Sequence, residues 1–213
     1  MSSIADIRKE YMLKKLEMED VDINPFSQFT KWWHDAMNSK IDEVNAFTLA
    51  TASLSGKPSA RIVLLKDYDE SGFIFFTNYT SNKGNQLAHN AEVALVFFWK
   101  ELERQVRIEG IATKVSGEIS DAYFLSRPPE SQIGAWASPQ SKVIENRNVI
   151  EENVLKYQKM FEEQQISRPQ HWGGYQVSPT MIEFWQGRPG RLHDRIQYCL
   201  QEDYSWKIER LAP

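Results

Sequence analysis

Five short apolar segments between residues 46 and 115 constrain the fold of this chain most strongly. Each is rich in β-branched and aromatic residues, which favour strands. Turn-forming clusters such as 55–58 and 69–72 separate them. Strands joined by such short connections favour an antiparallel barrel or a strongly curled sheet over a doubly wound fold. The expected strands are 46–53, 59–67, 72–78, 93–99 and 104–115.

Helices are expected around this sheet. The segment 27–40 carries four large apolar residues at near-helical spacing, namely Phe29, Trp32, Trp33 and Met37. Further helical patterns occur at 82–89, at 118–126 and, in a long charged stretch, at about 140–165. The sequence therefore predicts a fold class that is mainly β with flanking helices.

The end of the chain is expected to complete the same barrel. Strands are predicted at 176–186, 195–201 and 206–211, and no internal repeat or linker separates them from the rest. We therefore expect one domain over 21–213. The polar, charged arm over 1–20 is weakly specified and is expected to be mobile.

Bulk composition limits the possible partners. With 41% hydrophobic and 25% charged residues, the chain has an ordinary globular composition. A formal net charge of −4 gives no overall attraction to nucleic acid or to anionic membranes. The single cysteine, Cys199, excludes an internal disulfide framework and cannot by itself build a metal site, so no metal is expected. The charged N-terminus and the lack of a long apolar run predict a soluble, cytoplasmic protein.

The first candidate binding segment is Arg61-Ile62-Val63-Leu64-Leu65-Lys66, an apolar strand with a cation at each end. Taken alone, it is more typical of a core strand with solvated ends. Period-two alternation also sends Arg61 and Lys66 to opposite faces. Both reach one ligand only if the strand twists or bulges, or if one of them lies past its end.

A second candidate follows the next strand. Phe76 and Thr77 end that strand, and Ser81 and Lys83 stand where the next helix begins. A helix N-terminus offers free backbone N–H groups, and these side chains add donors suited to phosphate. An N-cap followed by a surface lysine is an equally plausible interpretation of this segment alone.

A third candidate is a phosphate clamp. Tyr123 and Arg127 lie one helical turn apart and are expected on the same helix face. Pro128 and Pro129 then end the helix and turn the chain towards Ser131. Two hydroxyl groups and a permanently charged guanidinium are suitable donors for a phosphate.

A cationic edge is expected near the C-terminus. Extended geometry would put Arg191, His193 and Arg195 on one side, after the aromatic strand that contains Trp185. A ring-shaped anionic ligand could stack on or beside Trp185 while these groups bind its polar atoms. Gln105 lies on the polar face of its strand and is functional only if that face looks into a site.

Seven motifs in order make the chain resemble the pyridoxine (pyridoxamine) 5'-phosphate oxidase family over nearly its whole length: RIVLLK, FFTN followed by SNK, LERQVRIEG, SRPPESQIGAW, EFWQG, RLHDR and WKIERLAP. The resemblance implies an FMN-binding split β-barrel that forms a homodimer, with one FMN in each of two clefts at the subunit interface. It implies oxidation of pyridoxine 5'-phosphate and pyridoxamine 5'-phosphate to pyridoxal 5'-phosphate, with O2 reduced to H2O2.

The resemblance also implies roles for individual residues. Those expected to contact FMN, some through the backbone and some across the dimer, are Arg61, Ile62, Val63, Leu64, Leu65, Lys66, Phe76, Thr77, Lys83, Gln105, Gln140, Ser141, Trp185 and Arg195. Those expected around the substrate are Arg8, Lys9, Glu10, Tyr11, Lys66, Tyr123, Arg127, Ser131, Arg191, Leu192 and His193. Arg191 and His193 are the expected catalytic residues, because they would orient the pyridine ring and assist charge or proton movement.

Two positions depart from the family pattern. Asn82 stands where an arginine is common, so one phosphate contact is expected to be lost or supplied by the backbone. Lys9 replaces a common arginine in the arm that resembles the family's cover over the active site, and is a less rigid donor. Two alternatives stay open: an FMN split-barrel oxidoreductase with another electron donor, and a non-catalytic carrier of FMN or pyridoxal phosphate.

Overall fold

The computed structural model describes residues 3–6 and 10–213 of the chain. Its strands are β1 Ala46–Ala52, β2 Pro58–Leu64, β3 Asp67–Asp69, β4 Gly72–Asn78, β5 Glu92–Trp99, β6 Arg104–Lys114, β7 Trp172–Gln186, β8 Asp194–Leu200 and β9 Trp206–Leu211. Its helices are α1 Pro25–Asn38, α2 Asn82–His89, α3 Gly117–Ser126, α4 Pro129–Ala137 and α5 Asn148–Met160, with short 3-10 turns η1 Ile4–Asp6 and η2 Pro189–Arg191.

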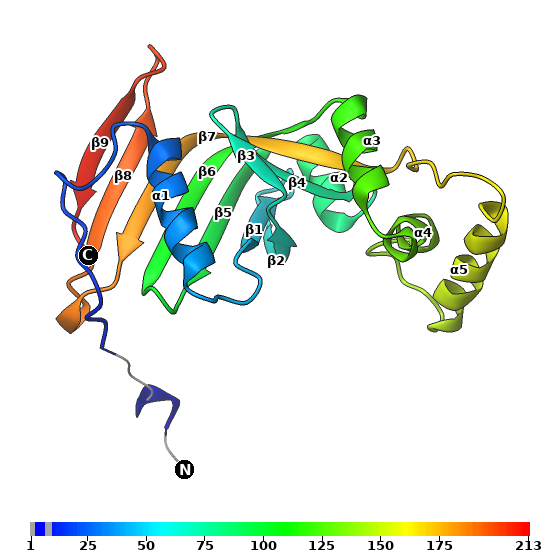
Figure 1. Cartoon of the computed structure of the whole chain (residues 1–213), viewed down its shortest axis with the longest axis horizontal. Coiled ribbons are helices and arrows are strands. Elements are labelled where there is room, and N and C mark those ends of the chain that lie inside the picture. The colour runs from blue at the N-terminus through cyan, green and yellow to red at the C-terminus, as the bar shows by residue number, and fades with distance from the viewer. Residues whose placement is uncertain (1–2, 7–9) are drawn as a thin grey trace.

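The nine strands form one antiparallel sheet in the order β2-β1-β5-β6-β7-β4-β3, with β8 added to β7 and β9 to β8. Figure 1 shows α1 lying across one face of this curled sheet, α3, α4 and α5 gathered at one end, and β8 and β9 at the other. The structure thus follows the antiparallel arrangement that the strand pattern predicts. None of the helices described is long and apolar enough to cross a membrane.

The core lies between α1 and the inner face of the sheet. Asn24 caps α1 by accepting hydrogen bonds from the backbone N–H groups of Phe26 and Ser27, and Pro25 suits the first helical turn. The helix then buries Phe29 and Trp32 against alternate residues of the strands. Those strand residues are Phe47, Leu49, Phe73, Leu95, Phe97, Val106, Ile108, Phe184 and Ile196. Each such side chain stabilises the fold by roughly 1.5–3 kcal/mol.

Strand β7 joins the two ends of the molecule. It pairs with β6 along nearly its whole length, with β4 near its start and with β8 near its end. Gly174, opposite Phe76, and Trp185, opposite Arg195, are eleven residues apart on this strand. At about 3.3 Å per residue, they stand roughly 35 Å apart.

Helix α4 was not expected from the sequence. Pro128 and Pro129 do end α3, as predicted, but the chain then starts a new helix because proline fits a first helical turn. The long helix expected at 140–165 is limited to α5, because the segment before it is irregular and Ser141 has a positive φ of 68°.

Part of the expected arm lies against the sheet. The backbone N–H groups of Met12 and Leu13 donate to Glu103 Oε2 over 2.8 and 3.1 Å. The N–H of Leu16 donates to Asp194 Oδ2 over 3.0 Å. The side chain of Leu16 is buried, whereas those of Met12 and Leu13 are exposed. The mobility of the arm over 1–20 stays a prediction.

Candidate functional site

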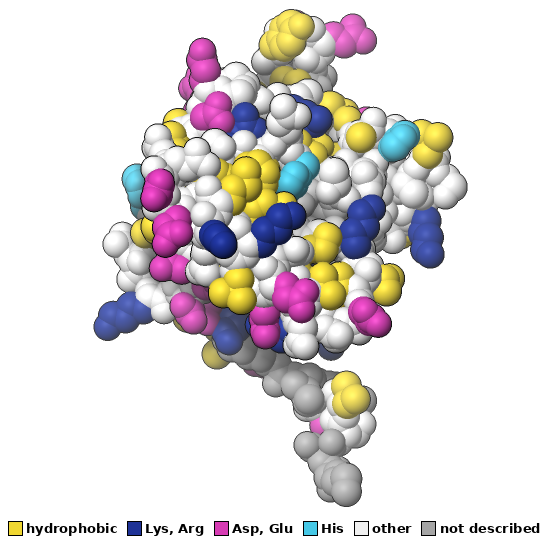
Figure 2. All heavy atoms as spheres, turned by 90° about the vertical axis from the view of Figure 1, so that its right-hand side faces the viewer, with side chains coloured by type: hydrophobic (Ala, Val, Ile, Leu, Met, Phe, Trp, Pro, Cys, Tyr) yellow, Lys and Arg dark blue, Asp and Glu magenta, His cyan; other side chains and the backbone are white. Residues whose placement is uncertain are grey.

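A cavity of about 640 Å³ lies where β2, β4, α3 and α4 meet. It brings together eleven of the residues predicted from the sequence: Ile62, Val63, Leu64, Lys66, Phe76, Thr77, Lys83, Tyr123, Arg127, Ser131 and Gln140. Figure 2 views the molecule from the end that carries α3, α4 and α5, where Lys and Arg side chains lie beside a hydrophobic patch. We call this cavity the phosphate-side pocket.

The question of how Arg61 and Lys66 are arranged is settled by where β2 ends. The strand stops at Leu64, Leu65 turns into the core, and Lys66 lies past the strand end and lines the pocket. Arg61 instead lies across β1, where its Nη1 donates to Thr51 Oγ1 over 2.6 Å. Burial lowers the pKa of Arg61. Of the two cations, only Lys66 faces this cavity.

Aromatic rings form one wall of the pocket. Phe76 stacks on Tyr123 with ring centroids 4.0 Å apart and on Trp172 at 5.6 Å. The Phe76 ring fits because Gly174 has no side chain: a Cβ there would stand 2.8 Å from it. Trp172 was missed in the sequence, where its strand was expected to start at Gln176. The pair Gly173-Gly174, typical of close backbone approach, is the signal that could have found it.

The clamp of Tyr123, Arg127 and Ser131 spans the break between α3 and α4. Tyr123 lies in the last turns of α3, while Arg127 is the residue that ends it, with extended dihedral angles. Ser131 lies in the first turn of α4, and its N–H donates to Pro128 O over 2.9 Å. All three line the pocket, as the sequence predicts, but Arg127 reaches it from the break and not from the helix face.

The electrostatics of the pocket favour an anion. Lys66, Lys83 and Arg127 line it, and none of the described residues in its wall is acidic. Burial lowers the pKa of Lys83, and the nearby charge of Arg61 adds to that effect. Burial also lowers the pKa of Arg127, whose guanidinium lies over the Trp172 ring at 4.6 Å.

One residue of the pocket wall, Arg127, has an unsatisfied donor. Arg127 Nη1 is buried and finds no hydrogen-bond partner in the described part of the chain. Buried donors are nearly always paired, so the Arg127 guanidinium keeps hydrogen-bonding capacity that the described residues do not use. Gln140 accepts a hydrogen bond from Lys83 Nζ over 3.2 Å and so places the lysine beside the cavity. A phosphate, with its several acceptor oxygens, fits this set of donors.

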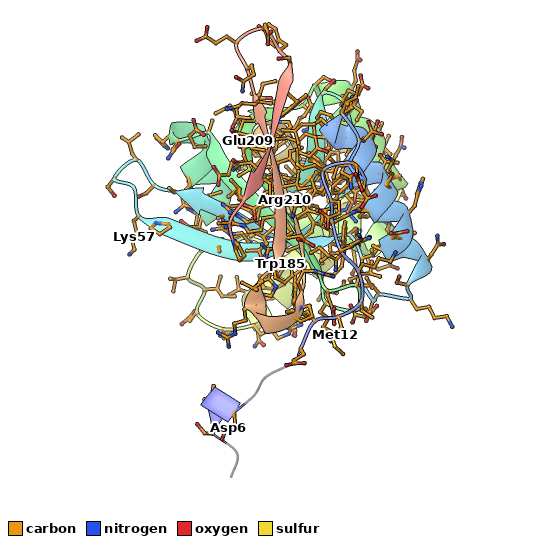
Figure 3. The ribbon with its side chains drawn as sticks, turned by 90° about the vertical axis from the view of Figure 1, so that its left-hand side faces the viewer. Asp6, Met12, Lys57, Trp185, Glu209 and Arg210 are labelled. Carbon is orange, nitrogen blue, oxygen red and sulfur yellow. The ribbon has the colours of Figure 1, made fainter. Side chains whose placement is uncertain are left out.

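A second group of predicted residues lies at the other end of β7. Register puts Gln105 opposite Trp185, and Trp185 opposite Arg195, so the three form a row across β6, β7 and β8. His193 packs on Trp185 with ring centroids 4.6 Å apart. We call this row with His193 the ring-side group. Figure 3 shows Trp185 at this end of the sheet, with Met12 of the arm towards the same end.

Glu183 holds the ring-side arginine. It is 1% exposed, and its two carboxylate oxygens accept from Arg195 Nε and Nη2 over 2.8 and 3.0 Å. Arg107 Nη1 also donates to it over 2.8 Å. The hydrogen bonds to Glu183 raise the pKa of Arg195. Glu183 was not among the predicted residues, although its period-two position two residues before Trp185 was a signal for it.

The extended geometry expected for 191–195 is wrong at its start. Arg191 belongs to the turn η2 and has a φ of 62°, because Pro189 and Gly190 break the strand. Strand β8 begins only at Asp194, so Arg191 does not alternate with His193 and Arg195. Arg191 and Leu192 are exposed.

His193 is held in a defined state. The backbone N–H of Arg188 donates to His193 Nδ1 over 3.1 Å, so that nitrogen is the acceptor. Burial, followed by the charge of Arg191, lowers the pKa of His193. Tyr11 from the arm packs edge-on against Trp185 at 5.7 Å and lies 5.9 Å from His193.

The remaining predicted residues lie apart from the pocket. Ser141 follows Gln140 in an exposed turn, and Glu10 is exposed at the start of the described arm. Arg8 and Lys9 lie outside the described residues. Asn82 is exposed at the start of α2 and is not part of the pocket wall.

Comparison with solved structures defines the class of fold. PhzG from Burkholderia lata 383, solved in complex with tetrahydrophenazine-1-carboxylic acid, has a TM-score of 0.88 and 26% identity, covering 96% of this chain and 100% of that chain. A pyridoxamine 5'-phosphate oxidase-related, FMN-binding protein from Nostoc punctiforme PCC 73102 has a TM-score of 0.70 at 15% identity, covering 91% and 100%. The fold is therefore the FMN-binding type of split β-barrel, as the sequence predicts.

The sequence comparisons define the family. The family model described as pyridoxamine 5'-phosphate oxidase matches residues 33–161, and the pyridoxine 5'-phosphate oxidase C-terminal dimerisation region matches 172–213. Pyridoxine/pyridoxamine 5'-phosphate oxidase from Nostoc sp. is 56% identical over 99% of both chains, and that from Paraburkholderia phymatum is 55% identical over 100% of both. The chain belongs to the pyridoxamine 5'-phosphate oxidase family of oxidoreductases.

Proposed function

We propose that this protein oxidises pyridoxine 5'-phosphate and pyridoxamine 5'-phosphate to pyridoxal 5'-phosphate, with FMN as cofactor and O2 as the final acceptor. The alcohol loses two electrons and two protons to give the aldehyde. The amine loses the same and then takes up water and releases ammonia. O2 receives the two electrons and two protons as H2O2. A cytoplasmic location stays an expectation from the sequence.

The observation that carries this proposal is the convergence of Lys66, Lys83 and Arg127 on a pocket without acidic residues among those described. Arg127, Tyr123, Ser131 and Lys66 converge there from three separate segments. A phosphate monoester supplies several acceptor oxygens for these donors. We propose that they hold the phosphate of the substrate and so fix the position of its ring.

The same pocket suits the phosphate-bearing cofactor. Lys83 stands in the first turn of α2, and its lowered pKa reflects a buried cation that an anion would stabilise. We propose that Lys83, Thr77 and the backbone of 62–66 hold FMN in this pocket, together with Phe76 and Gln140. Arg61 and Ser141, which lie outside the pocket wall, are proposed to contact FMN from beside it. FMN, when bound, supplies the two-electron acceptor and passes the electrons to oxygen.

The site is completed, in this proposal, by a second copy of the chain. The phosphate-side pocket and the ring-side group stand roughly 35 Å apart along β7, further than one substrate reaches. The match of 172–213 to a dimerisation region supports a homodimer. The exposed apolar side chains of Ile62 and Phe98 on the outer face of the sheet are also consistent with a covered surface.

In this arrangement the ring-side residues would orient the bound flavin and pyridine rings and stabilise charge beside them. Gln105, Trp185 and Arg195 would face FMN from the partner copy, with Arg195 held straight by Glu183. Arg191 and His193 would lie beside the pyridine ring. Because Nδ1 of His193 accepts from the backbone, its free Nε2 carries the proton in the neutral ring and is available to the substrate.

A second candidate function is supported by PhzG, whose complex contains tetrahydrophenazine-1-carboxylic acid. That comparison favours an oxidoreductase of the same fold with another electron donor. The clamp around Arg127 is rich in hydrogen-bond donors, which argues against an electron donor that lacks a phosphate. A non-catalytic carrier of FMN or pyridoxal phosphate would bind its ligand without turnover in the presence of oxygen.

The test is an absorption spectrum of the purified protein reconstituted with FMN. We expect the flavin band to bleach when pyridoxine 5'-phosphate is added without oxygen, and to return with air as pyridoxal 5'-phosphate forms. A flavin that binds but does not bleach with either phosphate ester would refute the substrate assignment. Failure to bind FMN would refute the proposal as a whole.

A further inference from the structure

The turn between β5 and β6 holds a buried carboxylate in a strained position. Glu103 is 3% exposed, although it lies in a short turn, and its φ is 55°. That left-handed conformation is unfavourable for a residue other than glycine, asparagine or aspartate. A strained residue with a buried carboxylate needs compensating contacts. Glu103 makes such contacts with its side chain and with its backbone.

The side chain of Glu103 reaches the N-terminal arm. Its Oε2 accepts from the backbone N–H groups of Met12 and Leu13, ninety-one and ninety residues away in sequence. The side chains of these two arm residues are 68% and 58% exposed. The arm at this point is therefore held by its backbone through one carboxylate, with little apolar packing of its own.

The backbone of Glu103 reaches the end of β7. Its carbonyl accepts from the N–H of Gly187 over 2.7 Å and from Gln186 Nε2 over 3.2 Å. Gln186 is fully buried and also accepts from Arg104 Nε over 3.0 Å. The turn is thus fixed to the residues that directly follow Trp185.

Together these contacts place Tyr11 beside the ring-side group. Tyr11 immediately precedes Met12, and its ring lies 5.7 Å from Trp185. It also fits closely over Gly187, where a Cβ would stand 2.7 Å from Tyr11. Glu103 therefore fixes the arm through its side chain, and it fixes the end of β7 beside Trp185 through its backbone.

We propose that Glu103 is a positioning residue, which holds Tyr11 against Trp185 and His193 and so shapes the ring-side half of the substrate site. This inference rests on the proposed function, because it concerns how the same site receives its substrate. Glu103 acts through the arm and does not itself touch the substrate.

The test compares Glu103→Met, which removes the acceptor and keeps much of the volume, with Glu101→Met, a matched change in the same turn at an exposed residue paired with Lys100. Hydrogen exchange of the Met12 and Leu13 amides is measured in the FMN-loaded proteins, with Leu16 as an internal control because Asp194 holds it. We expect faster exchange at Met12 and Leu13 only in Glu103→Met, because it leaves these N–H groups without their acceptor. We also expect its KM for pyridoxine 5'-phosphate to rise about tenfold, as for one lost positioned contact, with a smaller change in kcat.

A second variant tests the same inference without altering the carboxylate. Gly187→Ala should displace Tyr11 and raise KM similarly, while the Met12 and Leu13 amides stay protected. Unchanged exchange in Glu103→Met, or faster exchange with an unchanged KM in a folded variant, would overturn the inference. If the wild-type protein oxidises neither ester, the proposed function fails, and the exchange data still decide whether Glu103 anchors the arm.

Discussion

A buried arginine and a half-buried one provide a sharp test of the phosphate-side pocket. Arg127 and Arg104 both have a pKa lowered by burial. Arg104 has partners: Nη1 donates to Asp35 over 2.7 Å and Nε to Gln186 over 3.0 Å. Arg127 has an unsatisfied Nη1 within the described residues. Replacing each by methionine, which keeps much of the volume, should therefore affect stability and binding in opposite ways.

The expected magnitudes follow from these contacts. Arg104→Met leaves the buried Gln186 Oε1 without its donor, which costs about 1–3 kcal/mol, and loses a half-exposed ion pair worth about 1 kcal/mol. Arg127→Met loses a cation–π contact of about 0.5–1 kcal/mol but also relieves an uncompensated buried charge, so the free energy of unfolding should change by less than about 1 kcal/mol. One lost charge-assisted hydrogen bond, about 1.5–3 kcal/mol, should weaken phosphate-ester binding about 10- to 150-fold.

The assay pairs urea unfolding of the ligand-free proteins with titration of pyridoxal 5'-phosphate. Arg127→Met should unfold near the wild-type midpoint and bind weakly, whereas Arg104→Met should unfold at clearly lower urea. Wild-type affinity in Arg127→Met would refute the assignment of Arg127 to the phosphate. A loss of stability in Arg127→Met as large as in Arg104→Met would show that its guanidinium has a structural partner.

Three further predictions concern the ring-side group and two residues next to it, Arg191 and Glu183. Arg191→Met should lose most turnover and keep FMN, as measured by flavin titration beside steady-state rates; equal loss of flavin would contradict this division of roles. Glu183→Gln should lower the free energy of unfolding by about 1–3 kcal/mol, because the partly exposed Arg195 and Arg107 lose a shared buried charge while Gln keeps one acceptor oxygen; a denaturation midpoint like wild type would argue against this. His193 should titrate below its ordinary pKa near 6.5, so its contribution to stability is full above pH 6.5 and falls as the pH drops towards the lowered pKa. A ¹⁵N NMR titration should find a neutral ring protonated on Nε2 at pH 7. A pKa above 6.5 would contradict the expected burial effect.

Strand pattern predicts the sheet well because alternation and turn chemistry are local. The bounds of β4 and α2 agree with the sequence, since a turn residue marks each boundary. Helix α4 was missed because two prolines suggest an end to helix and do not show that a new one begins. The conformation of Arg191 depends on a glycine with a φ of 62° just before it, which residue pattern alone does not specify.

The site was harder to predict than the fold because its contacts are not local. Motif order indicates Tyr123, Arg127 and Ser131, and the structure brings them to one cavity. Trp172 and Glu183 were missed because their roles depend on strand pairing: one supports Arg127, and the other pairs with two arginines from neighbouring strands. No segment of sequence near Glu103 indicates that it binds an arm ninety residues away.

The length of β7 has a consequence for how the chain can vary. If the two ends of β7 belong to two different sites of a symmetric dimer, the continuous backbone of this strand fixes the distance between those sites. Deleting two residues would shorten it by about 7 Å and would misalign Trp172 at one site and Trp185 at the other together. Surface loops can change in length independently of each other, whereas the number of residues in β7 sets the geometry of both sites at once.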